Sequence, residues 1–340
     1  MDIEQTLQQA IAFHQSGEIQ KAEQLYRTIL TENPRHPDAN HNLGILFKQR
    51  SQLESALRFF KNALEVNLNQ VQFWISCIDT LIDLGEHDEA FKMLEQGQSQ
   101  GLKGNAIDQL ALRLNTLHEI ISPIIQTPKK TIKPGKLSQS QIDSIIRLCS
   151  KGQTKEALSA TKILSKAYPN ESQLYNISGV CYAGLDQLSA SVVNFEKALV
   201  IKPNYAEALY NLGNSLKDLG QFDAAIKNYK QALSIKPDYA EAYSNLGNTH
   251  QDLGQLEAAV SSYEQALVIT PNFAEAHCNL GVTFKELGEL DKAKNCYGKA
   301  LTINPSYVEA KWNLALAQLV LGDFKTGWLN YENRWKKKDF

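Results

Sequence analysis

Small side chains recur along the chain with a period of 34 residues, and they mark two positions at which helices can approach closely. Within each unit, position 8 is usually Gly or Ala and position 20 is usually Ala. Position 24 is aromatic in seven units, and position 32 is proline in six. Small residues permit close helix contact, and an adjoining ring fills the remaining space with buried apolar area. We therefore predict two packed helices per unit, in nine units that begin at residues 3, 37, 71, 138, 172, 206, 240, 274 and 308.

The predicted helices have recognisable ends. Position 15 is glycine in seven units, and glycine there can take the left-handed conformation that closes the first helix. Proline at position 32 stops the second helix. Position 33 holds residue types that are common at helix N-caps, and Glu or Gln follows three residues later, which is a capping-box pattern. The predicted caps are Asn170, Asn204, Asp238, Asn272 and Ser306, followed by Gln173, Glu207, Glu241, Glu275 and Glu309.

These columns resemble the tetratricopeptide repeat (TPR), a helix–turn–helix unit of 34 residues. The resemblance covers the chain except for a stretch near its middle. It implies an all-α fold, an α-solenoid (TPR superhelix) of about nine helix–turn–helix units, in which each helix pair buries its apolar face on its neighbours.

The repeat is interrupted at residues 105–137. Residues 105–121 still follow a helical pattern, and prolines and lysines without any acid come next. That composition suits an extended linker. We therefore expect an N-terminal array over residues 1–122, a Pro/Lys linker over 123–137 and a C-terminal array over 138–340. The linker lysines have two interpretations, a solvated hinge or a site for phosphate or an acidic partner.

Asparagine recurs at position 6 although it is a mediocre helix former. A carboxamide offers a donor and an acceptor, so evenly spaced amides can hold the backbone of an extended chain. The alternative is that these amides hydrogen-bond between neighbouring helices. The predicted peptide-binding residues, on the concave groove, are Asn211, Asn245, Asn279, Asn313 and Asn42 at position 6, with Asn214 and Asn248 at position 9.

This asparagine column resembles the ladder that lines the TPR superhelix of O-linked N-acetylglucosamine transferase. The resemblance implies binding of protein substrates and partners, mainly over residues 206–316. The glutamates at position 2 are explained by capping and by the helix dipole. A clamp for a peptide's terminal carboxylate is not supported, because Glu275 and Asn279 stand where that clamp needs basic residues.

The last unit carries large apolar residues where earlier units are polar. Trp312, Leu316 and Leu319 replace polar positions, and Trp328 and Trp335 follow. One interpretation is a terminal helix that covers the end of the stack. The segment also resembles the closing repeat of bacterial TPR proteins, which implies contact with a following glycosyltransferase-like domain. A third interpretation is self-association through these apolar surfaces.

Composition narrows the function. The 35 basic and 37 acidic residues give a net charge of −2, which disfavours nucleic-acid and anionic-membrane binding. The chain shows no apolar span and no signal peptide, and its five cysteines are scattered, so we expect a cytoplasmic protein. No nucleophile, phosphate-loop or metal motif is present, and His250 and His277 fall at core positions. We expect a protein-interaction scaffold without a cofactor, a metal or its own active site; the alternative is the substrate-recruiting part of a larger glycosyltransferase.

Overall fold

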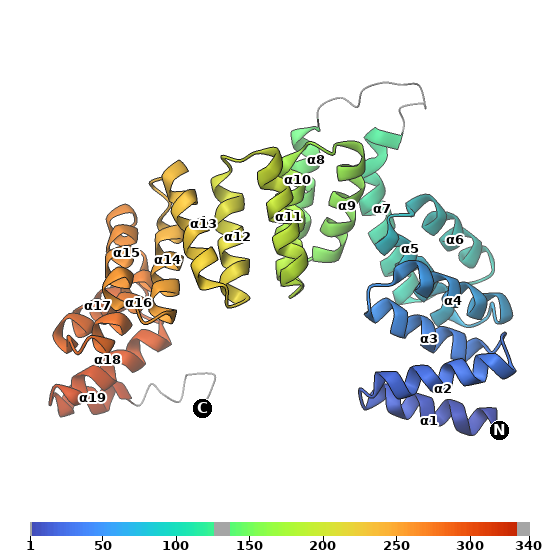
Figure 1. Cartoon of the computed structure of the whole chain (residues 1–340), viewed down its shortest axis with the longest axis horizontal. Helices are drawn as coiled ribbons and strands as arrows, with labels where there is room; N and C mark the ends of the chain where they lie inside the picture. The colour runs from blue at the N-terminus through green and yellow to red at the C-terminus, as the bar shows by residue number, and fades with distance from the viewer. Residues whose placement is uncertain (1, 126–136, 332–340) are drawn as a thin grey trace. The chain divides into compact units, whose positions relative to one another are not determined.

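The computed structural model describes the backbone of residues 2–125 and 137–331, and the side chains of 2–120 and 137–331. Contacts between residues divide the chain into two compact units, 1–169 and 170–340. In the described residues every regular element is a helix, and within each unit successive helical hairpins lie side by side in chain order (Figure 1). The prediction of an all-α repeat fold is confirmed.

The first unit contains four hairpins and one unpaired helix. Its helices are α1 (Ile3–Gln15), α2 (Ile19–Glu32), α3 (Pro37–Gln49), α4 (Leu53–Val66), α5 (Val71–Leu84), α6 (His87–Ser99), α7 (Asn105–Ile125), α8 (Gln139–Ser150) and α9 (Thr154–Ala167). The unpaired helix is α7, which packs on α5 and α6 before it and on α8 and α9 after it.

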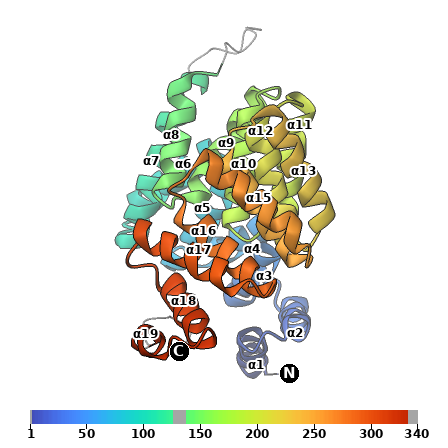
Figure 2. The ribbon, with the colours of Figure 1, turned by 90° about the vertical axis from the view of Figure 1, so that its left-hand side faces the viewer.

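The second unit contains five hairpins. Its helices are α10 (Ser172–Gly184), α11 (Leu188–Ile201), α12 (Ala206–Asp218), α13 (Phe222–Ile235), α14 (Ala240–Asp252), α15 (Leu256–Ile269), α16 (Ala274–Glu286), α17 (Leu290–Ile303), α18 (Val308–Val320) and α19 (Phe324–Tyr331). The first helix of each hairpin also contacts the first helix of the next, so α10, α12, α14, α16 and α18 form one layer. The turned view in Figure 2 shows α18 and α19 at the end of this unit.

The glycine at position 8 and the ring at position 24 pack directly on one another, as predicted. A Cβ added to Gly213 would lie 2.6 Å from Cε1 of Tyr229, and one added to Gly247 would lie 2.7 Å from Cε1 of Tyr263. Both rings are fully buried. Replacing such a glycine would therefore force the ring out of the hairpin core.

The turn between the two helices of a hairpin needs a left-handed residue. All seven glycines at position 15 have positive φ, which confirms the prediction. Two hairpins make the same turn without glycine, through Ser51 (φ 59°) and Asp186 (φ 58°). An L-residue pays a steric cost in this conformation, so these two turns are strained relative to the others.

The predicted helix N-caps are wrong. The first helices of the second unit begin one residue later than the capping pattern requires, so position 34 is the cap residue. The cap residues are Glu171, Tyr205, Tyr239, Phe273 and Tyr307, and none of their side chains makes a capping hydrogen bond. The aromatic ones pack toward the core, as Tyr205 does with 8% of its surface exposed. The glutamates at position 2 thus lie in the first helical turn without a capping partner, and only the helix dipole explains them locally.

The interrupted region differs in detail from the expectation. The helix predicted over 105–121 is present, but α7 continues to Ile125 and so enters the segment expected to be linker. Residues 126–136 of that segment, including its lysines, lie outside the described residues. The contacts place α8 and α9 in the N-terminal unit, whereas we expected residues 138–340 to form one array. The boundary at 123–137 stays a prediction.

Candidate protein-binding face

One stripe of each first helix in the second unit combines amides and carboxylates. Positions 2, 6, 9 and 13 of a unit are separated by three or four residues and therefore share one helix face. We call this stripe on four consecutive first helices the amide face. It comprises Glu207, Asn211, Asn214 and Asp218 on α12, Glu241, Asn245, Asn248 and Asp252 on α14, Glu275, Asn279, Val282 and Glu286 on α16, and Glu309, Asn313, Leu316 and Val320 on α18.

The asparagines of this face bond to one another across neighbouring hairpins. Asn245 Nδ2 donates to Asn214 Oδ1 at 2.9 Å and to the Tyr210 hydroxyl at 3.1 Å. Asn279 Nδ2 donates to Asn248 Oδ1 at 3.0 Å. Asn211 Nδ2 donates to the Oδ1 of Asn176, a buried side chain on α10, at 3.2 Å.

These hydrogen bonds hold the amides in place and leave some of their donor and acceptor sites free. The asparagines at positions 6 and 9 of the amide face are half-buried, so each still reaches solvent. A carboxamide has two N–H donors and two acceptor sites, and the bonds described use only part of that capacity. The interpretation that the amides hydrogen-bond between neighbouring helices is therefore confirmed. Their role in binding a peptide backbone stays a prediction.

Tyrosine hydroxyls support the amides from the second helices. The Tyr229 hydroxyl donates to Asn214 Oδ1 at 2.7 Å, and the Tyr263 hydroxyl donates to Asn248 Oδ1 at 2.6 Å. Burial raises the pKa of both phenols well above the usual range, so they remain protonated donors. In these two hairpins a tyrosine, the amide at position 9 and the next hairpin's amide form one continuous chain of hydrogen bonds.

Three other hairpins have a tyrosine at position 24 without an amide at position 9; in one of them position 9 is Leu316, and Tyr331 stacks on Trp312. In the other two, position 9 is Val282 beside Tyr297 and Ile11 beside Tyr26. The hydroxyls of Tyr297 and Tyr26 are buried and have no hydrogen-bond partner among the described residues. The hairpins with Phe60 or Phe195 at position 24 have no hydroxyl there that needs a hydrogen-bond partner. Among the described residues, a buried tyrosine hydroxyl at position 24 is thus hydrogen-bonded where position 9 is an amide, and it has no partner where position 9 is Val282 or Ile11.

The remaining predicted amides lie in other surroundings. Asn313 on α18 is half-buried and lies close enough to hydrogen-bond with the Cys278 thiol. Burial raises the pKa of that thiol to about 11. Asn42 lies on α3, in the first unit, and so does not join the amides of the second.

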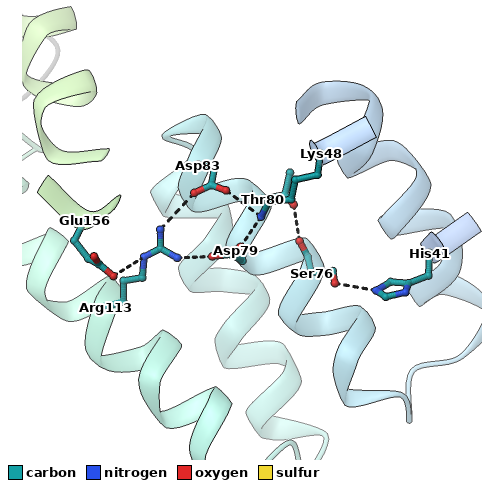
Figure 3. A network of polar contacts seen from close by, with 8 residues as sticks. All are labelled: His41, Lys48, Ser76, Asp79, Thr80, Asp83, Arg113 and Glu156. Carbon is teal, nitrogen blue, oxygen red and sulfur yellow. Dashed lines mark hydrogen bonds and ion pairs between the residues drawn. The ribbon is translucent and has the colours of Figure 1, made fainter. Parts of the chain in front are cut away.

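The first unit has charged groups in place of amides on its first helices (Figure 3). Lys48 on α3 lies 2.5 Å from Asp79 and 2.9 Å from Asp83, both on α5. Arg113 on α7 also pairs with Asp79 and Asp83, and its Nε lies 3.1 Å from Glu156 on α9. Burial alone would raise the pKa of Asp79, but Lys48 and Arg113 hold that pKa below its usual value. This network ties α3, α5, α7 and α9 together.

The sequence did not predict this network. Its ion pairs join side chains that are 30 to 43 residues apart, and one of them crosses the interruption of the repeat. The available signal was an acid, Asp79, at position 9, where two units of the second array have an amide, with Lys48 one unit earlier.

Large apolar side chains are exposed at the end of the second unit, and of the residues predicted there only Trp328 is one of them in the described part of the chain. Trp312 stacks on Tyr331 with ring centroids 4.9 Å apart, and Leu319 packs against Gly327. Leu316 is half-buried, and Trp328 remains 58% exposed. We define the terminal patch as Val320, Phe324, Trp328 and Leu329, all of them exposed. Trp335 lies outside the described residues.

The histidines that the sequence places at core positions pack in the interior of their hairpins. His250 and His277 are buried, as expected for packed histidines. No group of three or more His, Cys, Asp or Glu side chains in the described part of the chain could hold a metal ion. A cavity of 840 Å³ between α15, α16 and α17 includes none of the predicted amides. No described helix combines the length and apolar character needed to cross a bilayer.

Comparison with known proteins agrees with the architecture. A family model described as TPR repeat matches residues 182–220, 213–254 and 251–288, and two models described as tetratricopeptide repeat match 274–307 and 7–67. No curated protein sequence matches the chain.

Three solved structures are among those that match part of the chain. PilF of Pseudomonas aeruginosa is 16% identical with a TM-score of 0.52, over 58% of this chain and 96% of that one. YrrB, described as a TPR protein with an unusual peptide-binding site, is 23% identical with a TM-score of 0.46, over 57% and 96%. MamA is 27% identical with a TM-score of 0.45, over 47% and 94%.

Proposed function

The chain belongs to the tetratricopeptide repeat family, and on that premise we propose that its amide face binds an extended segment of another protein. A TPR solenoid of this kind is a protein-interaction scaffold. The observation that carries the finer proposal is the chain of partly exposed amides, which hydrogen bonds from neighbouring amides and from tyrosine hydroxyls hold in place. Because their rotamers are already fixed, little side-chain entropy is lost when a ligand backbone replaces water.

The amide face suits recognition of a backbone rather than of particular side chains. An extended segment presents an alternating series of N–H and C=O groups, and carboxamides complement both. Neighbouring helix axes are about 8–10 Å apart, and an extended chain advances about 3.3 Å per residue, so each first helix corresponds to about three residues of ligand. Four first helices therefore offer a track for a segment of roughly ten residues.

Replacing four amides tests this proposal. The variant carries alanine at Asn211, Asn245, Asn279 and Asn313 in the full chain. A matched control carries alanine at Asn194, Asn228 and Asn295, which lie on the second helices. We expect the first variant to lose most binding to peptides selected from a random library on the wild-type chain, and the control to keep it.

Folding must be followed in the same experiment, because these amides also join hairpins. A second variant with leucine at the four positions keeps about the size of each side chain and adds no charge, but removes the N–H donors and the oxygen acceptors. Unchanged peptide binding by both variants, with intact far-UV circular dichroism, would refute the proposal.

The terminal patch supports a second candidate function. Phe324 and Trp328 are exposed at 61% and 58%, and Val320 at 71%, which is unusual for a cluster of large apolar side chains. The occupants that the sequence suggests are a following glycosyltransferase-like domain and a second copy of the chain. Light scattering on the wild type and on Trp328→Ala separates them. A wild-type dimer that Trp328→Ala dissociates supports self-association, and a monomeric wild type refutes it.

A further inference from the structure

We infer that the segment bound by the amide face is basic, an extended stretch rich in Lys and Arg; this inference rests on the proposed function. The charge of the second unit is divided between its helix layers. The first helices α12, α14 and α16 carry six carboxylates and two lysines. The second helices α13, α15 and α17 carry four carboxylates and five lysines. The excess of negative charge therefore lies on the layer that bears the amides.

The carboxylates border the amides on both sides. Glu207, Glu241 and Glu275 lie in the first turns of α12, α14 and α16, and Asp218, Asp252 and Glu286 are the last residues of the same helices. All six are exposed. Positions 2 and 13 are about 16 Å apart along a helix, with the amides between them. An extended segment that lies across the amides would have carboxylates along both of its edges.

Helix electrostatics explain only one of these two rows. Glutamate in a first turn is favoured by the helix dipole. Aspartate or glutamate at the last residue faces the negative end of the dipole and is unfavourable there. Three consecutive first helices nevertheless end in Asp218, Asp252 and Glu286. A local stabilising role does not account for that row, whereas an external cation does.

The first unit shows what an acid at this position binds. Asp83 occupies position 13 on α5, and Lys48 on α3 and Arg113 on α7 pair with it and with Asp79. The chain therefore already contains this acidic stripe in a form saturated with basic side chains (Figure 3). In the second unit the carboxylates at position 13 have no such partners among the described residues except Lys217 beside Asp218, and they leave places for basic groups from outside.

In the described part of the second unit, its own cations leave these carboxylates almost without ion pairs. Residues 148–333 contain no arginine. Of the six carboxylates, only Asp218 has a lysine within 4 Å among the described residues, and that lysine is its chain neighbour Lys217 at 3.9 Å. Glu286 accepts a hydrogen bond from Gln251 Nε2 at 3.1 Å, where the first unit uses Lys48. Lys236, just before α14, lies over the ring of Tyr239 instead.

Three labelled peptides of equal length test the inference on the full chain. They are (Lys-Thr)8, (Gln-Thr)8 and (Glu-Thr)8, and binding is followed by fluorescence anisotropy at low and high salt. We expect (Lys-Thr)8 to bind most tightly and (Glu-Thr)8 least, with the preference shrinking as salt rises. Equal or weaker binding of (Lys-Thr)8 than of (Gln-Thr)8 would overturn the inference.

Two triple variants locate the effect. Asp218→Asn, Asp252→Asn and Glu286→Gln together should weaken (Lys-Thr)8 binding about tenfold, since each exposed ion pair contributes modestly. The matched control changes Asp223→Asn, Glu257→Gln and Asp291→Asn, which removes three carboxylates from the second helices. Equal weakening by both triple variants would overturn the inference, because it would indicate attraction by net charge alone.

The four-asparagine variant distinguishes the two proposals. If (Gln-Thr)8 binds as well as (Lys-Thr)8 and alanine at the four asparagines abolishes both, the amide face is a binding site and the basic partner is wrong. If alanine at the four asparagines changes no peptide's affinity, the proposed function itself fails.

Discussion

The pairing of a tyrosine hydroxyl with an amide at position 9 predicts opposite effects for one substitution at two equivalent sites. Tyr263→Phe removes a hydroxyl that donates to Asn248 at 2.6 Å, whereas Tyr297→Phe removes a buried hydroxyl with no described partner. Both rings are fully buried against the glycine of their own hairpin, so the packing change is the same. The comparison therefore isolates the hydrogen bond.

The expected change in the free energy of unfolding follows from the surroundings of the two hydroxyls. A buried hydrogen bond contributes about 1 kcal/mol, and an unsatisfied buried polar group costs about 1–3 kcal/mol. The Tyr263 hydroxyl also donates to Gln251 Oε1 at 3.1 Å. In the Tyr263→Phe variant Asn248 Oδ1 keeps its bond from Asn279 and Gln251 Oε1 keeps its bond from Thr283, so no acceptor is orphaned. We expect Tyr263→Phe to destabilise by about 1 kcal/mol and Tyr297→Phe to stabilise by about 1 kcal/mol.

Urea unfolding of the full chain, followed by far-UV circular dichroism, measures both changes. The substitution Val282→Asn adds a further check, because it offers Tyr297 the amide that the neighbouring hairpins have. Its effect should be more favourable with Tyr297 than with phenylalanine at that position. Equal destabilisation by Tyr263→Phe and Tyr297→Phe would refute the reasoning.

Three further predictions concern the turns and the charged network. Asp186→Gly should stabilise the chain by about 0.5–1 kcal/mol because φ is 58° there, while Gly220→Ala, in the equivalent turn, should destabilise it by about 1 kcal/mol; thermal unfolding measures both. Arg113→Met should cost about 2 kcal/mol, because it leaves Asp79, Asp83 and Glu156 without their shared cation, and wild-type behaviour in urea would contradict the network. Burial, and secondarily Arg113, lowers the pKa of His87 from 6.5 to about 4. As pH falls, the unfolded chain therefore binds this proton before the folded chain does. The free energy of unfolding should fall by roughly 3 kcal/mol between pH 6.5 and pH 4. His87→Leu should flatten that dependence in a series of unfolding midpoints, and a slope identical to that of the wild type would contradict it.

The repeat made the hairpins predictable, because glycine at position 8 and the ring at position 24 are two halves of one contact. The N-caps were not predictable in the same way. Asn204 is a good cap by residue type, but burying Tyr205 takes precedence and shifts the start of α12 by one residue. Packing of a large ring outweighs a single capping bond.

The candidate site was only partly visible in the sequence. The column that holds Asn211, Asn245 and Asn279 follows from periodicity, but the bonds from Asn279 to Asn248 and from Tyr263 to Asn248 depend on how neighbouring hairpins stack. The sequence alone does not single out the carboxylates at position 13, because an acid near the end of a helix looks like any solvated surface residue. Their unfavourable place in the helix dipole becomes clear only when the helix ends are known.

The most direct measurement is the side-chain amide spectrum of the ¹⁵N-labelled full chain during titration with (Lys-Thr)8, (Gln-Thr)8 and (Glu-Thr)8. The account predicts that the peptide that binds shifts the Nδ2 resonances of Asn211, Asn245 and Asn279, and leaves those of Asn228 and Asn295 on the second helices unchanged. Saturating binding that shifts Asn228 and Asn295 but not the first-helix amides would contradict it.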